Sequence, residues 1–124
     1  MKVIITGSNG LLGQNLIDLL LREKDKYQVF GFSRGENRSG RDDFEYVNID
    51  ITNEKHLKES IDNIQPDCII NTAAMTNVDA CENDRDGCYD LNVNVVQYLI
   101  DACLKVDAHL IHLSTDFIFD GVKG

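Results

Sequence analysis

Three glycines near the start of the chain constrain its fold more than any other feature. Gly7, Gly10 and Gly13 follow a short β-branched run, Lys2–Thr6, and open a segment, Leu11–Lys24, with apolar residues at helical spacing. A strand, a G-x-x-G-x-x-G loop and a helix in this order are typical of dinucleotide-binding sites. The alternative is a glycine-rich turn that holds no ligand.

Each glycine has its own expected role in such a loop. Gly7 permits the tight turn from strand to helix, Gly10 lets the backbone approach a pyrophosphate, and Gly13 lets the helix pack closely on the sheet. The helix N-terminus then presents free N–H groups and a partial positive charge to the phosphates. We expect the other residues of the loop to line the same site: Asn9, Leu11 and Leu12.

The rest of the chain alternates between strand and helix patterns. The further expected strands are Tyr27–Phe32, Phe44–Ile49, Asp67–Ile70 and His109–Leu113, and the further expected helices are Asn53–Ile64 and Cys88–Val106. Thr52 is the expected N-cap of the first of these helices. The pattern predicts an α/β fold, a Rossmann-type doubly wound parallel sheet of order 3-2-1-4-5 with helices on both faces. A length of 124 residues fits one such domain.

Charge and hydropathy exclude several classes of protein. The formal net charge of −9 argues against a nucleic-acid partner, because phosphate binding along a nucleic acid needs a basic surface. No apolar run approaches the roughly 20 residues that span a bilayer. Met1 and Lys2 lead into only three apolar residues before the glycine loop, so no signal peptide is expected. We therefore expect a cytoplasmic protein with no membrane partner.

The cysteines and histidines do not form a metal-binding pattern. No two cysteines make a C-x-x-C pair, and we expect reduced structural thiols. His109 and His112 bracket an apolar strand, and we expect a structural role for both. The remaining residues of these types are Cys68, Cys81, Cys88, Cys103 and His56.

The end of the second strand bears on the choice of cofactor. In this fold an acidic side chain there bonds the adenosine ribose and favours NAD. Here the strand ends in Ser33-Arg34. The Arg34 guanidinium can pair with a 2′-phosphate and the Ser33 hydroxyl can donate to it, which favours NADPH. Two alternatives stay open: Arg34 is a solvated charge, or Glu36 reaches a ribose hydroxyl and NADH is used.

Two further segments belong to this end of the expected site. The loop from Ser33 to Asp43 also carries Arg38 and Arg41, and we expect any ligand contact of this loop to use its basic residues. Asp50 and Ile51 follow the third strand, where an acid can bond the adenine amino group and an aliphatic side chain can cover the ring. The alternative is an aspartate that only starts a helix.

Four motifs now indicate a family. Thr6 to Gly13, Asn71 to Ala74, Leu91-Asn92-Val93 and Leu113 to Asp116 occur in the order seen in extended short-chain dehydrogenases. More narrowly, residues 71–79 and 114–121 resemble the dTDP-4-dehydrorhamnose reductase family, which reduces a nucleotide-linked 4-keto sugar with NAD(P)H. The resemblance covers the whole chain. It implies a keto sugar nucleotide as substrate, and it is compatible with a homo-oligomer.

The expected topology brings these motifs to one edge of the sheet. The glycine loop, Ala73-Ala74-Met75 and Ser114-Thr115 follow strands one, four and five, whose carboxyl ends meet where ligands bind. Small side chains at 73 and 74 let the cofactor run close over the strand end. The resemblance also implies that Asn92 and Ser114 belong to the cofactor site. It further implies that Thr115 bonds the carbonyl oxygen of the substrate.

The proton donor of the family is a tyrosine in a Tyr-x-x-x-Lys motif. No tyrosine of this chain is followed by lysine four residues later: Tyr98 precedes Ala102, and Tyr89 precedes Val93. We therefore expect residues 1–124 to be the NAD(P)-binding N-terminal part of a longer enzyme, truncated before the substrate domain and inactive alone. Two alternatives remain: an NAD-dependent sugar-nucleotide epimerase or dehydratase, and a non-catalytic regulatory subunit resembling the methionine adenosyltransferase beta subunit.

Overall fold

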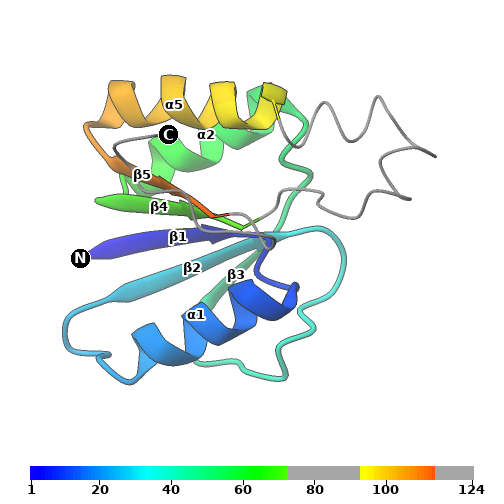
Figure 1. Cartoon of the computed structure of the whole chain (residues 1–124), viewed down its shortest axis with the longest axis vertical. Coiled ribbons are helices and arrows are strands. Elements are labelled where there is room, and N and C mark those ends of the chain that lie inside the picture. The colour runs from blue at the N-terminus through cyan, green and yellow to red at the C-terminus, as the bar shows by residue number, and fades with distance from the viewer. Residues whose placement is uncertain (73–92, 114–124) are drawn as a thin grey trace.

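A computed structural model describes residues 1–72 and 93–113, which form a parallel sheet between two layers of helices (Figure 1). The elements in chain order are β1 Lys2–Thr6, α1 Leu11–Leu21, β2 Gln28–Ser33, β3 Glu45–Asn48, α2 Glu54–Ile64, β4 Cys68–Asn71, α5 Val95–Val106 and β5 His109–His112. The strand order is β3-β2-β1-β4-β5, and every pairing is parallel. The α/β fold and strand order expected from the sequence are thus confirmed.

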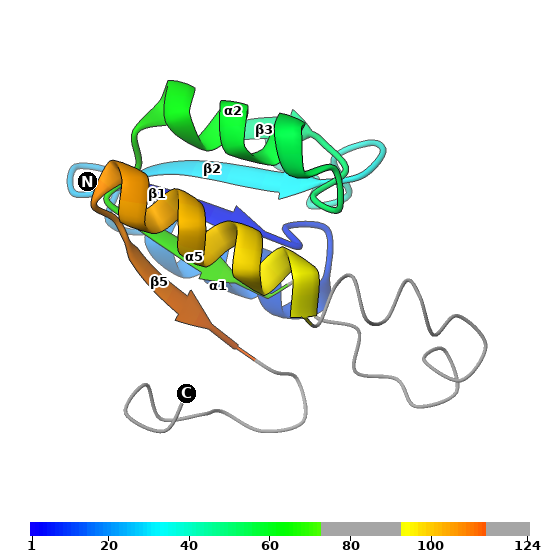
Figure 2. The same cartoon turned by 90° about the horizontal axis from the view of Figure 1, so that it is seen from above.

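The central strand, β1, is buried on both faces. Helix α1 lies on one face of the sheet, and α2 and α5 lie side by side on the other (Figures 1 and 2). Alternate residues of β1 face the two layers. Ile5 packs in the same cluster as Ile17 of α1, whereas Ile4 packs with Leu57 of α2 and Leu99 of α5. Burial on both faces explains why β1 has no alternation of polar and apolar residues.

The helix boundaries differ from the expected ones in ways that local bonds explain. The N-cap of α2 is Asn53 and not Thr52: the Asn53 side chain accepts a hydrogen bond from the His56 N–H, 3.2 Å away. The Thr52 hydroxyl instead donates to the Asp50 carboxylate over 2.6 Å. Helix α1 ends at Leu21, where backbone bonds from Arg22 and Glu23 tighten to i→i−3.

The strand boundaries lie close to the expected ones, and the start of the expected helix Cys88–Val106 lies outside the described residues. Strands β2, β3, β4 and β5 each begin or end within one residue of the expected position. The described part of α5 begins at Val95, and residues 88–92 of the expected helix lie outside the described residues. In residues 1–72 and 93–113, no helix has the length and apolar character that crossing a membrane requires.

Candidate functional site

The glycine loop joins β1 to α1 at the carboxyl edge of the sheet. Gly7 has φ +73°, a left-handed conformation that favours glycine. The N–H groups of Gly7 and Ser8 donate to the Phe32 carbonyl of β2 over 2.8 and 3.2 Å. A Cβ on Gly13 would stand 2.3 Å from the Gly7 carbonyl oxygen. The fold itself therefore requires glycine at positions 7 and 13.

Gly10 is different, because the fold does not demand glycine there. It is exposed, and its φ of −75° and ψ of 164° suit any residue. Among the described residues, a Cβ at this position would meet only the Gly7 carbonyl oxygen, at 3.3 Å. A requirement for glycine at position 10 would thus come from something that approaches the loop from outside.

The N-terminus of α1 is open to such an approach. Its N-cap is Gly10, no side chain of the described residues caps it, and its first turn holds no acidic residue. Leu11, the first helical residue, is 80% exposed. The free N–H groups and the positive end of the helix dipole are therefore directed at a surface that an anion can reach.

The side chain of Asn9 does not point into this space. It bonds the turn after β2, donating to the carbonyl oxygens of Glu36 at 2.8 Å and Arg34 at 3.3 Å and accepting from the Arg38 N–H at 2.7 Å. The Asn9 carbonyl oxygen accepts a bond from the Gln14 side chain over 2.8 Å. Asn9 thus links the glycine loop to the segment that carries Arg34.

Beside Arg34 lies an open hollow of about 550 Å³ between β3 and α2. Its lining residues are Arg34, Val47, Asn48, Ile49, Asp50, His56, Glu59, Ser60 and Asn63. Arg34 and Asp50, both expected in the cofactor site, are thus brought together here, whereas Ile51 is only 7% exposed and packs in the core.

The Asp50 carboxylate also organises the start of α2. Its Oδ1 accepts bonds from the hydroxyl and the N–H of Thr52, at 2.6 and 3.0 Å. The hydroxyl bond first, and the nearby Arg34 guanidinium as a further cause, hold the pKa of Asp50 below its ordinary value. Asp50 therefore holds the turn before α2 and is also one of the residues that line the hollow.

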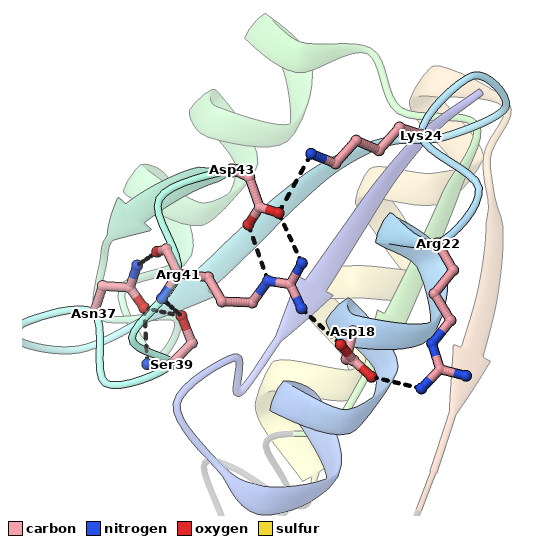
Figure 3. A network of polar contacts seen from close by, with 7 residues as sticks. All are labelled: Asp18, Arg22, Lys24, Asn37, Ser39, Arg41 and Asp43. Carbon is pink, nitrogen blue, oxygen red and sulfur yellow. Dashed lines mark hydrogen bonds and ion pairs between the residues drawn. The ribbon is translucent and has the colours of Figure 1, made fainter.

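The basic loop after β2 is not a free set of cations. Arg41 forms a two-bond pair with Asp43, at 2.9 and 2.7 Å, and bonds Asp18 of α1 at 2.6 Å (Figure 3). Lys24 approaches the same Asp43 carboxylate at 3.4 Å. The bond to Asp43 raises the pKa of Arg41, and the bond from Arg41 lowers the pKa of Asp43. The Arg41 guanidinium therefore ties the loop to α1, and the expectation that ligand contacts of this loop use its basic residues stays a prediction.

A second polar cluster lies at the ends of β1, β4 and β5. The buried Thr6 hydroxyl donates to the side-chain oxygen of Asn71, and the Asn71 amide lies 3.0 Å from Nδ1 of His112. Burial lowers the pKa of His112, which favours a neutral ring whose Nδ1 accepts the amide hydrogen. The Thr72 hydroxyl donates to the Thr6 carbonyl oxygen over 2.7 Å. This cluster fixes three strand ends beside the expected site, and the structural role expected for His112 agrees with it.

Sequence reasoning did not find the close approach of β2 to the glycine loop. A Cβ on Gly31 would stand 2.8 Å from Cβ of Ser8 and 2.7 Å from the Phe44 ring. A glycine inside a strand pattern is a known signal for such an approach. Ser8 is 1% exposed, and its hydroxyl has no hydrogen-bond partner among the described residues.

Six expected site residues cannot be placed, because they lie outside the described residues: Ala73, Ala74, Met75, Asn92, Ser114 and Thr115. Among the residues that are described, no three histidine, cysteine or acidic side chains are grouped so that they could hold a metal ion. Cys68 and Cys103 are free thiols, and burial raises the pKa of Cys103 to about 11.

Comparison with known proteins identifies relatives over the whole length of the chain. The family described as the RmlD substrate binding domain matches residues 1–124. A dTDP-4-dehydrorhamnose reductase of Aggregatibacter actinomycetemcomitans is 36% identical over 122 residues, which is 98% of this chain and 37% of the relative. The methionine adenosyltransferase 2 subunit beta of Pongo abelii is 33% identical over 98% of this chain and 34% of its own length.

A solved structure with a similar fold carries the same name as the first of these relatives. The crystal structure of a hypothetical dTDP-4-dehydrorhamnose reductase from Sulfolobus tokodaii superposes with a TM-score of 0.78 at 34% identity, covering 100% of this chain and 42% of the other. The chain therefore spans well under half the length of the proteins it matches.

Proposed function

This chain belongs to the RmlD substrate binding domain family, and on that premise we propose that it is the NAD(P)-binding part of a reductase acting on a nucleotide-linked 4-keto sugar. The observation that carries the proposal is the glycine loop at the end of β1. It combines a position 10 that the fold leaves free with an uncapped helix N-terminus. The name dTDP-4-dehydrorhamnose reductase, borne by a relative at 36% identity, supplies the proposed reaction.

The described residues fit a dinucleotide. The backbone of the glycine loop and the first turn of α1 would hold the pyrophosphate. The hollow beside Arg34 and Asp50 would take the adenosine. NADPH is the proposed cofactor, because Arg34 can pair with its 2′-phosphate and no acidic residue ends β2. Once bound, the cofactor supplies a hydride to the keto sugar.

Residues outside the described part complete the proposed site. Ala73, Ala74 and Met75 follow β4 in sequence, and Asn92 and Ser114 belong to motifs shared with the family. Thr115 would donate a hydrogen bond to the substrate carbonyl oxygen, where negative charge develops. The proton donor and the substrate domain would come from the rest of a longer protein, since this chain covers only 37% and 42% of the two relatives and holds no Tyr-x-x-x-Lys motif.

The experiment that tests the proposal measures NADPH oxidation by the full-length protein with dTDP-4-dehydro-L-rhamnose. We expect turnover, and we expect Thr115→Val to lower kcat about 100-fold with little change in cofactor affinity, because such donors act mainly in the transition state. A wild-type kcat in this variant would show that Thr115 only caps a turn. No turnover by the full-length protein with this substrate would contradict the proposed reaction.

A second function has a specific observation in its favour. The methionine adenosyltransferase 2 subunit beta of Pongo abelii is 33% identical over almost the whole chain. A non-catalytic regulatory subunit would bind the dinucleotide through the same loop but would not oxidise it. Cofactor binding without turnover, together with a full-length sequence that lacks Tyr-x-x-x-Lys, would favour this function over the reductase.

A further inference from the structure

The turn that carries Arg34 is held from two sides by side chains that contact its backbone. Asn9 of the glycine loop bonds the backbone of Arg34, Glu36 and Arg38. From the other side, the Tyr46 hydroxyl of β3 lies 2.7 Å from the Gly35 carbonyl oxygen, to which it donates.

Strand β3 contributes a second contact to the turn, and its Tyr46 side chain also bonds Asn9, which holds the turn from the other side. The side-chain oxygen of Asn48 accepts a bond from the Gly35 N–H over 2.9 Å. The Asn9 amide also donates to the Tyr46 hydroxyl over 3.2 Å. Gly35 has φ +81°, so the turn has a conformation that needs glycine and is stabilised at both its N–H and its carbonyl group.

We propose that Tyr46 is a positioning residue for cofactor choice, which acts by holding the turn that presents Arg34 to the 2′-phosphate of NADPH. The inference rests on the proposed function and adds to it a residue that sequence reasoning did not single out. The Arg34 side chain is exposed and starts from a loop, so ordering it around a phosphate costs conformational entropy. A turn already fixed before binding reduces that cost, and only a cofactor with the 2′-phosphate gains from it.

The contacts distinguish this role from a general structural one. Tyr46 is partly buried, and its hydroxyl bonds are made to Asn9 and to the turn. Removal of the hydroxyl alone, in Tyr46→Phe, leaves the ring in place. Tyr27→Phe is the matched control, because Tyr27 is also partly buried but lies at the other end of β2, beside Lys24 and Phe44.

The test measures NADPH and NADH dissociation constants of the full-length protein by calorimetry. We expect Tyr46→Phe to weaken NADPH about three- to tenfold, the effect of one hydrogen bond, and NADH by less than about twofold. Tyr27→Phe should change neither. Asn48→Ala removes the other contact to Gly35 and also changes the lining of the hollow, so it should weaken both cofactors, with a loss for NADPH at least threefold greater than that for NADH. It carries the test if Tyr46→Phe does not fold.

A double-mutant cycle establishes whether Tyr46 acts through Arg34. Arg34→Ala alone should weaken NADPH about 10- to 100-fold, and in that background Tyr46→Phe should change NADPH binding by less than about twofold. Equal losses for NADPH and NADH in Tyr46→Phe, or an undiminished effect in the Arg34→Ala background, would overturn the inference alone. No effect of Arg34→Ala would instead contradict the proposed cofactor, and the inference would fail with it.

Discussion

The half of the sheet formed by β3, β2 and β1 and the half formed by β4 and β5 differ in how far helices cover their strands. In β2, four consecutive residues are buried, between α1 on one face and the α2 layer on the other. In β5 no residue is fully buried, and Ile111, on the face that β1 and β2 turn toward α1, is 45% exposed. Strand β4 packs on both faces, with Ile69 in the α2–α5 cluster and Ile70 against the α1 cluster, so the contrast lies in β5. This edge strand contacts α5 on one face, whereas the β1–α1–β2–β3 half forms a compact frame around the proposed cofactor site.

The polar contacts of the two halves also differ, in the parts of the chain that they connect. In the first half they tie loops to each other and to α1, through Asn9, Tyr46 and Arg41. In the second half they fix the ends of strands, through Asn71 and His112. We infer different roles for the two halves: contacts in the first half hold the loop proposed to bind the cofactor. Contacts in the second half align the strand ends that precede the residues proposed to contact the substrate.

The largest expected effect concerns the packing of α1 on the sheet. Gly13→Ala would place a Cβ 2.3 Å from a backbone oxygen that cannot move freely, so we expect about 3 kcal/mol of destabilisation. Gly10→Ala is the control, since its Cβ would stand at 3.3 Å and its backbone conformation is ordinary. Thermal unfolding of both variants measures the difference. Equal stability of the two would show that the first half is not as tightly packed as we describe.

A smaller effect on stability, of opposite sign, is expected when either of two buried hydroxyls, those of Ser8 and Thr6, is removed. Ser8 has no partner among the described residues, whereas Thr6 donates to Asn71. Removing an unbonded buried hydroxyl relieves a desolvation cost, so Ser8→Ala should stabilise the fold by about 1 kcal/mol, and Thr6→Val should destabilise it by a similar amount. Denaturant unfolding checks both signs. A loss of stability in Ser8→Ala would mean that its hydroxyl is bonded.

The smallest expected effect is a pH dependence in the second half. Burial lowers the pKa of His112, so the unfolded chain binds a proton more readily than the folded protein does. Stability from the neutral ring is present above the ordinary histidine pKa of about 6.5 and is lost as pH falls from there through the lowered folded value. His112→Gln keeps an acceptor for Asn71 and should flatten this part of the curve of unfolding free energy against pH.

His109→Gln, an exposed substitution on the same strand, controls for the exchange itself. If the curves of the His112→Gln variant and the wild type have the same slope between pH 7.5 and 5, the neutral His112 is not part of what holds the strand ends.

The fold was predictable from the sequence because its signals are local. The run Lys2–Thr6, the glycine spacing and the amphipathic helix patterns each depend on neighbouring residues, and the topology follows from the alternation of strands and helices. The need for Gly7 and Gly13 was also local, since both belong to one turn. These features define the strands, the helix α1 and the glycine loop of the first half.

The remaining features depend on residues far apart in the chain. Arg41 pairs with Asp18, 23 positions earlier, and the Asn9 amide meets Tyr46, 37 positions later. No pattern of neighbouring residues distinguishes a paired arginine from a solvated one. Thr52 and Asn53 are both good cap residues, and the choice between them was made by the bond from Thr52 to Asp50.

The central claim is that the glycine loop holds a dinucleotide, and Gly10→Val tests it most directly. The backbone at position 10 is extended and exposed, so the fold should accept valine, while the branched side chain would occupy the place of the pyrophosphate. We predict that calorimetric titration of the full-length variant with NADPH shows no binding, with an intermediate loss in Gly10→Ala and thermal unfolding close to that of the wild type. Unchanged NADPH affinity in a folded Gly10→Val protein would contradict the claim.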